Sequence, residues 1–292
     1  MKKIADRCLV GFAWLSAGMV TLAAVMLVGF LLRRGLASID GSLFFGETHW
    51  LDAVSGRAPV FEGIWPALMG TLYLVLVSSF VSIPVGIASG VYLAEYASKR
   101  VRASLGCAVD LLAGTPSIVM GLFGFALILL LRRTLFPQAG TSLALAALCI
   151  ALLVLPYVIR TTQTALQAIP VHLRILGPVC GLSGLQAIVH ILLPVASRGI
   201  LSGVILAMGR AAEDTAVILL TGVVAQAGMP RGLWERFEAL PFRIYYLAAE
   251  HQTRRQLDQG FATSLVLLLL TSTLFLTAFM LQRRFEKRWK KW

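Results

Sequence analysis

The sequence predicts an all-α fold, a polytopic membrane bundle of about six transmembrane helices. Of its 292 residues, 58% are hydrophobic and only 14% are charged, and the mean hydropathy is +0.82. A soluble domain of this length would need more charged surface to cover its core. The apolar residues also form continuous runs, whereas the strands of a membrane barrel would alternate apolar and polar residues. Helices are therefore expected.

Six apolar runs are long enough, because a helix needs roughly 20 apolar residues to cross a hydrocarbon layer of ~30 Å. They lie at residues 8–32, 66–93, 104–131, 142–163, 199–226 and 259–281. The first run follows basic residues, as in a signal peptide, but it exceeds the roughly 7–15 apolar residues of such a peptide. We interpret it as a retained span. Residues 1–65 then hold the first helix and an outer loop, and residues 66–292 form the main transmembrane domain.

The net charge of +12 does not indicate nucleic-acid binding, because its distribution follows a membrane topology. The greater part of the 26 lysines and arginines falls in segments on the same side as the N-terminus. Both termini are therefore predicted to be cytoplasmic, with the basic tail at 283–292 lying against anionic lipid.

No motif for catalysis or metal binding stands out. The sequence has no GxxxxGK[ST], HExxH or GxSxG pattern, so the chain is expected to be no enzyme and to bind no cofactor or metal, and any ATP hydrolysis would need another chain. The four cysteines, with no CxxC among them, are interpreted as small apolar packing residues; they are Cys8, Cys107, Cys149 and Cys180.

The run at 199–226 holds Arg210, Glu213 and Asp214 near its centre. A charge at mid-bilayer costs at least ~2.5–3.5 kcal/mol, so three together need a reason. Arg210 and Asp214 are four residues apart and can pair on one helix face, which Glu213 flanks. One interpretation is an ion-pair network that fixes helix register. The favoured one is a polar lining for an ion path.

Two further places are candidates for the same path. Arg160 ends the fourth span and is either an anchor at the membrane surface or a second cation that faces the path. Thr115 and Ser117 flank Pro116, where a break in the helix would let hydroxyls face a cavity. The alternative for both hydroxyls is a hydrogen bond back to the helix backbone.

The segment at 164–198 is too apolar for a free loop. It predicts two short helices, at about 171–177 and 183–191, separated by glycines and a proline. Such a pair either docks into a groove on a partner or lies on the membrane surface.

Several motifs resemble a known family. In GLSGLQAIVHILLP, Gly181 precedes Ile191, Leu193 and Pro194 at the spacing of the cytoplasmic signature of ABC importer permeases. The stretches YLAEYA, LLAGTPSIVMGLFG, LPYVIRTTQTAL and GRAAEDTAVILLTG resemble the permease subunit of the phosphate (Pst-type) ABC importer, from about residue 66 to the C-terminus. The chain departs from the signature where Glu-Ala-Ala is usual, at Ile175, Leu176 and Gly177, and Pro178 is expected to interrupt the first short helix.

The resemblance implies a type I ABC importer permease (MetI-like) architecture in a bacterial inner membrane, and import of inorganic phosphate. It implies four kinds of partner: a cytoplasmic ATPase dimer that uses the ATP, a second related permease subunit, a periplasmic phosphate-binding protein and membrane lipid. Arg210 and then Arg160 are the first candidates for the substrate path. The residues expected to contact the ATPase from the coupling segment at about 164–198 are Gly181, Ile191, Leu193, Pro194 and Arg174.

Other functions stay open at this point. The substrate could be another oxyanion, such as sulfate, molybdate or phosphonate. A different class of function is an ATP-independent secondary transporter or a membrane signalling scaffold. A secondary transporter typically shows internal repeats, and none is visible by eye.

Overall fold

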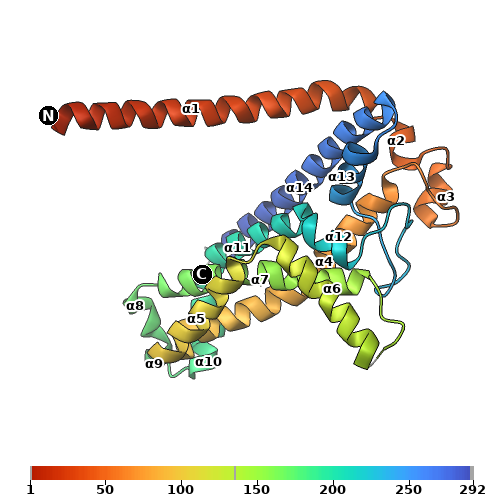
Figure 1. The fold of residues 1–292 in the computed structure, drawn as a ribbon. Coiled ribbons are helices and arrows are strands. Elements are labelled where there is room, and N and C mark those ends of the chain that lie inside the picture. Colours follow the sequence, from red (N-terminus) through yellow and green to blue (C-terminus); the bar gives the residue numbers. More distant parts are fainter. Residues whose placement is uncertain (1, 135, 290–292) are drawn as a thin grey trace.

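The chain forms a bundle of helices (Figure 1). The computed structural model describes residues 2–134 and 136–289. Within them, six helices are long and apolar enough to cross a membrane, which confirms the predicted fold class. The spans are Leu9–Ser38, Trp65–Tyr96, Ser117–Thr134, Leu143–Gln167, Gly184–Glu213 and Arg254–Met280.

Long helices alternate with short ones along the chain. The long helices are α1 (Lys2–Gly35), α4 (Trp65–Val91), α6 (Ser117–Thr134), α7 (Leu143–Gln167), α11 (Leu193–Glu213) and α14 (Arg254–Trp289). The shorter elements are η1 (Leu36–Ser38), α2 (Gly41–Phe45), α3 (Trp50–Ser55), η2 (Tyr92–Tyr96), α5 (Lys99–Ala113), α8 (Val171–Arg174), α9 (Leu176–Val179), α10 (Gly184–Ala187), η3 (Ile188–Leu192), α12 (Ala216–Thr221) and α13 (Leu240–Glu250). We call the end of the bundle that holds α8, α9 and α10 the short-helix end, and the end that holds residues 222–239 the loop end.

The third span differs from the expected helix at 104–131. The chain there forms two helices, α5 and α6, with a break at Gly114–Pro116. Pro116 lacks a backbone N–H and disfavours the helical conformation at Thr115, so it ends one helix and begins the next. In Figure 1, α5 turns toward the short-helix end whereas α6 runs away from it. Only α6 is long and apolar enough to span.

The fifth span is also displaced from its expected position at 199–226. It begins earlier, because α10 and the π-helical turn η3 lead directly into α11, and it ends at Glu213. Asp214 is extended, with a ψ angle of 121°, and its Oδ1 accepts a hydrogen bond from the backbone N–H of Val217 at 2.9 Å. This side chain competes with the continuing helix for backbone donors, and the chain restarts as α12.

Helix α7 lies at the centre of the bundle, between α4 and α11. Glycines bring these backbones close together, because side chains at their positions would collide with α7. A Cβ atom at Gly86 of α4 would lie 2.7 Å from Val158, and one at Gly203 of α11 would lie 1.8 Å from Thr161 Oγ1. The core around α7 includes the buried side chains of Leu74, Ile150, Val154 and Ile218.

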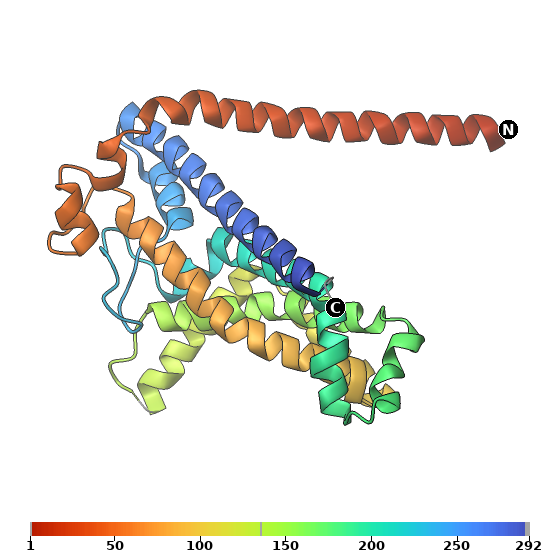
Figure 2. The same ribbon diagram turned by 180° about the vertical axis from the view of Figure 1, so that it is seen from behind.

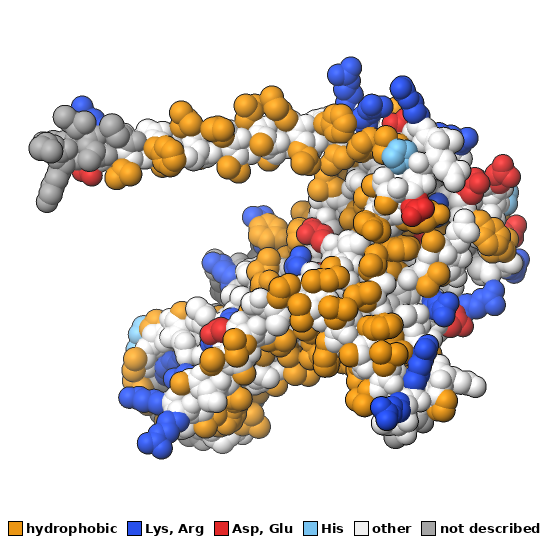
Figure 3. All heavy atoms as spheres, in the orientation of Figure 1, with side chains coloured by type: hydrophobic (Ala, Val, Ile, Leu, Met, Phe, Trp, Pro, Cys, Tyr) orange, Lys and Arg blue, Asp and Glu red, His pale blue; other side chains and the backbone are white. Residues whose placement is uncertain are grey.

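Helix α1 stands apart from the rest of the bundle. Both views show it leaving the other helices, with its N-terminal end far from them (Figures 1 and 2). No residue in the apolar window of this span is buried, and hydrophobic side chains cover its surface (Figure 3). The C-terminal end of α1 contacts α14, where the Phe30 and Phe261 rings pack edge to face with their centroids 5.4 Å apart.

Candidate functional site

The predicted pair of Arg210 and Asp214 is present at the break between α11 and α12. Arg210 Nη2 lies 3.2 Å from Asp214 Oδ2, with the carboxylate side chain 2% exposed and the arginine side chain 41% exposed. Asp214 Oδ1 caps the next helix, as described above. The two carboxylate oxygens therefore have different partners: Oδ1 accepts from the backbone and Oδ2 pairs with the charge of Arg210.

The break lies partway along the bundle and not at its loop end. Helix α12 continues toward the loop end, packed against α6, and its last carbonyl, at Thr221, accepts a hydrogen bond from Ser142 at the start of α7. Its six residues span about 9 Å, so Arg210 lies well below that end. Glu213 is exposed and forms no ion pair within the described part of the chain.

Arg160 is engaged by several groups at once. Its Nε and Nη2 atoms contact the Asp110 carboxylate at 2.9 and 2.6 Å. Its Nη1 donates to Gln163 Oε1 at 2.9 Å, and Nη2 also donates to the Gly106 carbonyl at 2.7 Å. These bonds hold α5 against α7. A cavity of about 500 Å³ opens beside them, lined by Arg102, Ala103, Gly106, Cys107, Asp110, Leu111 and Arg160.

The hydroxyls beside Pro116 are half-buried. Thr115 Oγ1 donates to the Leu112 carbonyl at 2.5 Å, which is the backbone bond foreseen as the alternative to a cavity-facing role. Ser117 begins α6 on the other side of the proline. The structure brings neither residue into contact with Arg210 or Arg160 among the hydrogen bonds of the described residues.

The short-helix end contains the residues expected to contact a partner. Gly181 has a φ angle of +70°, which favours glycine, and Ser183 begins α10 with a capping box to Gln186. Ile191 and Leu193 are half-buried and pack against a cluster of apolar side chains that includes Leu166 and Ile188. Beyond them, Pro194 lies in the first turn of α11.

The expected first short helix at 171–177 is interrupted, but not at Pro178. It ends at Arg174, and α9 begins at Leu176 and includes Pro178. A proline is tolerated in the first turn of a helix because its missing N–H would have no partner there. The expectation that Pro178 breaks this helix is therefore wrong, and the break is one turn earlier.

Residues 82–291 match the family described as "Binding-protein-dependent transport system inner membrane component". The chain belongs to this family. The family match includes Arg160, Arg210 and the short-helix end, whereas residues 1–81, with α1 among them, lie outside the match.

Relatives agree with this assignment, and a solved structure shares the fold. The chain is 32% identical to "Phosphate transport system permease protein PstA 1" of Mycobacterium tuberculosis over 75% of this chain and 69% of that protein. It is 30% identical to "Phosphate transport system permease protein PstA" of Haemophilus influenzae over 85% of this chain and 83% of that protein. A bacterial alginate ABC transporter structure matches with a TM-score of 0.64 at 18% identity, over 93% of this chain and 94% of that one, which shows a shared fold.

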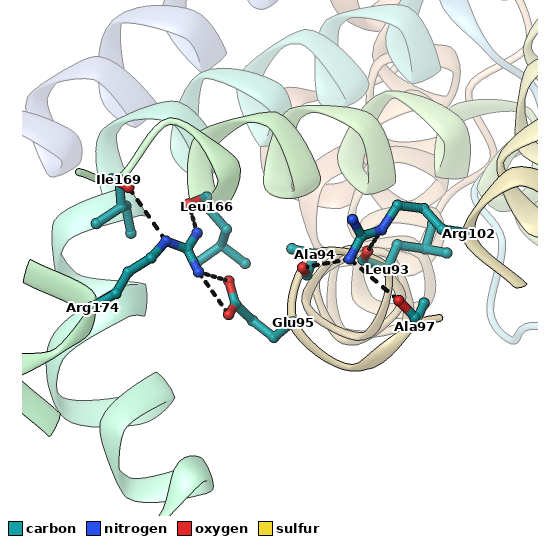
Figure 4. A network of polar contacts seen from close by, with 8 residues as sticks. All are labelled: Leu93, Ala94, Glu95, Ala97, Arg102, Leu166, Ile169 and Arg174. Atoms are coloured by element: carbon teal, nitrogen blue, oxygen red, sulfur yellow. Dashed lines mark hydrogen bonds and ion pairs between the residues drawn. The ribbon is translucent and has the colours of Figure 1, made fainter. Parts of the chain in front are cut away.

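Sequence reasoning named Arg174 but missed the network around it (Figure 4). Arg174 Nη1 donates to both carboxylate oxygens of Glu95, at 2.9 and 2.8 Å. The other nitrogens of Arg174 donate to carbonyls at the end of α7, those of Ile169 and Leu166. Glu95 stands 79 residues earlier in the sequence, so no local spacing could reveal the contact.

A second buried ion pair, near the loop end, was also missed. Arg243 Nη1 lies 3.1 Å from Glu238 Oε1, and Arg243 Nη2 donates to the Glu62 carbonyl at 2.9 Å. Burial raises the pKa of Glu238 above its usual value, against the opposing charge and hydrogen bond of Arg243. Both side chains are almost fully buried, so this pair fixes α13 to the loop that precedes α4.

The cysteines do not all occupy the interior. Cys149 is buried in α7, but Cys107 and Cys180 are exposed. The interpretation of the cysteines as packing residues is therefore wrong for Cys107 and Cys180. The side chain of Cys8 lies outside the described residues.

Proposed function

We propose that this chain is the permease subunit of an ATP-driven importer that moves inorganic phosphate from the periplasm to the cytoplasm of a bacterium. The observation that carries the proposal is an arginine at a helix break partway along the bundle, with donors that no described residue engages, in a chain whose relatives are named phosphate permeases. Helix breaks at membrane depth are tolerated where the irregular backbone lines a cavity or a path.

Arg210 is the residue we assign to the substrate. A guanidinium presents five N–H donors in a planar fork that fits a tetrahedral oxyanion. Among the described residues, Asp214 is the one charged group that Arg210 contacts, through Nη2. The remaining donors and the 41% exposed side chain leave room for a phosphate ion. Asp214 balances the arginine charge when no anion is bound.

Arg160 is the second candidate for a residue that lines this path. Its Nε, Nη1 and Nη2 atoms already donate to Asp110, Gln163 and Gly106, so an anion would have to displace one of them. The open cavity beside it gives an anion access. Thr115 and Ser117 supply hydroxyls at the neighbouring break, and exposed Glu213 would only repel an anion that passes it.

The short-helix end is the surface we assign to a cytoplasmic ATPase. Large apolar side chains are exposed there, including Val171 at 73%, Val179 at 77% and Leu185 at 67%. Apolar side chains on short helices suit a hydrophobic groove on a partner. Lys and Arg side chains gather beside them in Figure 3, as the cytoplasmic face of a membrane protein requires. Both termini are then cytoplasmic, the loop end faces the periplasmic phosphate-binding protein, and the second permease lies beside this chain in the membrane.

The test is uptake of radiolabelled phosphate by vesicles that contain this permease, its partner permease, the ATPase and the binding protein. Wild-type vesicles should accumulate phosphate only with ATP. Arg210→Ala should remove nearly all uptake, and Arg210→Lys should keep part of it, because a lysine preserves the charge without the fork. Wild-type uptake by Arg210→Ala would exclude this arginine from the path.

The same vesicles separate the alternatives. Uptake that proceeds without ATP would indicate a secondary transporter. Uptake in which unlabelled sulfate, molybdate or phosphonate competes better than unlabelled phosphate would indicate another oxyanion. For the ATPase surface, a cysteine at Gly184, where a side chain meets nothing within 4 Å, should crosslink to the ATPase when exposed Cys180 is replaced by serine.

A further inference from the structure

Two π-helical turns mark the places where the short-helix end joins the long helices. Turn η2 ends α4, and η3 begins α11. Such turns are rare and occur frequently at functional sites. The segment between α7 and η3 contains α8, α9 and α10, and apolar side chains from η2, α7 and η3 meet behind it in one cluster, among them Ala94, Leu166 and Ile188.

Arg174 ties this segment to two long helices. In Figure 4 its guanidinium lies between the carboxylate of Glu95, on η2, and the carbonyls of Leu166 and Ile169, at the end of α7. The Leu166 carbonyl also accepts a hydrogen bond from the Ile169 backbone N–H at 3.2 Å, and a cation at a helix C-terminus is favourable. Nε, Nη1 and Nη2 all donate hydrogen bonds, and the side chains of Arg174 and Glu95 are only 27% and 15% exposed.

A second arginine stiffens the turn that holds Glu95. Arg102, on α5, donates from Nε to the Leu93 carbonyl at 2.7 Å, and from Nη2 to the carbonyls of Ala94 at 3.0 Å and Ala97 at 3.3 Å. The two guanidinium groups thus bind opposite sides of the same turn (Figure 4). Glu95 is therefore presented to Arg174 by a backbone whose own carbonyls are already bonded.

We propose that Glu95 and Arg174 are positioning residues that make the short-helix segment move as one body with the ends of α4 and α7. The inference rests on the proposed function, because it assigns this pair to coupling between ATP hydrolysis and transport. A displacement of the segment by the ATPase then reaches α7 directly. From α7 it reaches α11, which carries Arg210 and packs on α7 through Gly199 and Gly203.

The departure from the usual Glu-Ala-Ala opening agrees with this role. Positions 175–177 offer Ile, Leu and Gly, so none of the three carries a charge toward a partner. Arg174, directly before them, directs its guanidinium inward to Glu95 and the end of α7. The segment is consequently held by a charged contact on its inner side, while apolar side chains cover its outer side.

The experiment measures phosphate taken up and ATP hydrolysed in the same vesicles with the full complex. Arg174→Gln and Glu95→Gln remove one charge each and keep a polar side chain of similar size. Both complexes should retain the ATPase and hydrolyse ATP. The phosphate imported per ATP should fall about tenfold, the scale of a typical coupling between sites.

A matched control is the exposed ion pair of Arg34 and Asp258, 3.3 Å apart near the loop end. Asp258→Asn should leave the ratio of phosphate to ATP unchanged. An unchanged ratio in both Arg174→Gln and Glu95→Gln would overturn the inference, and so would equal losses of hydrolysis and uptake, since these indicate a purely structural pair. If wild-type vesicles transport sulfate and not phosphate, the assigned substrate is wrong, and the ratio measured with sulfate still decides the positioning role.

Discussion

Arg174 and Arg210 both pair with a carboxylate, yet their surroundings differ. Arg174 donates from Nε, Nη1 and Nη2 and joins α8 both to the end of α7 and to η2, where Glu95 lies 79 residues earlier in the sequence. Arg210 contacts a carboxylate four residues further along, through one nitrogen. A guanidinium whose three nitrogens all donate hydrogen bonds fixes structure, whereas one with a single engaged nitrogen remains able to bind an anion. The number of engaged donors therefore separates the two roles better than the presence of charge does.

Arg160 lies between these two cases. It is as fully bonded as Arg174, but its partner Asp110 is 65% exposed and a cavity opens beside it. Water competes for such a contact, so the pair stabilises less than a shielded one. Within this comparison, Arg160 resembles a structural arginine that an anion can reach.

The largest expected difference is in stability. Arg174→Ala should lower the free energy of unfolding by about 2–3 kcal/mol, because it leaves the shielded Glu95 carboxylate without its partner and removes one donor each from the Leu166 and Ile169 carbonyls. Arg210→Ala should lower it by only about 1 kcal/mol, since the 41% exposed side chain contacts Asp214 through one nitrogen and Asp214 keeps its bond to Val217. The measurement is unfolding of each purified variant in mixed micelles. Equal losses would show that engaged donors do not distinguish the two arginines.

A smaller effect is expected at Asp214, where two tasks can be separated. Asp214→Asn keeps an oxygen for the Val217 N–H, whereas Asp214→Ala loses it and should cost about 1 kcal/mol more in stability, as for other helix caps. In transport, Asp214→Asn should relax discrimination against sulfate. An ionised carboxylate only accepts hydrogen bonds, so it disfavours an oxyanion that has no proton to donate.

The control for this selectivity is the adjacent carboxylate. Glu213 is exposed and forms no ion pair in the described part of the chain, so Glu213→Gln should change sulfate competition less than Asp214→Asn does. Competition by unlabelled sulfate against labelled phosphate measures both variants. A larger effect from Glu213→Gln would show that Glu213, and not Asp214, sets the discrimination against sulfate.

The long helices could be predicted from the sequence because hydropathy is a property of continuous runs. Their interruptions could not all be placed. Pro116 signals a break, yet the apolar run continues through it, and the expected span at 104–131 joined two helices that diverge. Asp214 ends α11 through a bond to the backbone three residues ahead, which depends on a local geometry that hydropathy does not record.

The candidate site divides in the same way. The pair of Arg210 and Asp214 was predictable, because residues four apart in a helix share a face. The contact of Arg174 with Glu95 was not, since it requires the ends of α4 and α8 to meet in space. Its components were visible as motif residues, but their pairing is a property of the packed bundle.

A fourth arginine pair extends the comparison to the most buried case. The side chains of Arg243 and Glu238 are 8% and 2% exposed, and the Nε atom of Arg243 is buried without a hydrogen-bond partner among the described residues. Burial therefore opposes the charged form of this pair more strongly than in the other three. The pH dependence of stability measures the balance between the desolvation of Glu238 and its attraction to Arg243.

The smallest expected effect is the pH dependence of this pair. The pKa of Glu238 is raised in the folded protein, so the folded state binds its proton more tightly than the unfolded state does. The contribution of the protonated Glu238 to the free energy of unfolding is fully present below the pKa of the unfolded state. It is lost as the pH rises through the raised pKa of the folded state. Glu238→Gln, which cannot titrate, should lack this loss. The stability of the wild type relative to Glu238→Gln should therefore decrease as the pH rises above about 4.5, the ordinary value for Glu. A relative stability that increases over this range would show that attraction to Arg243 outweighs burial.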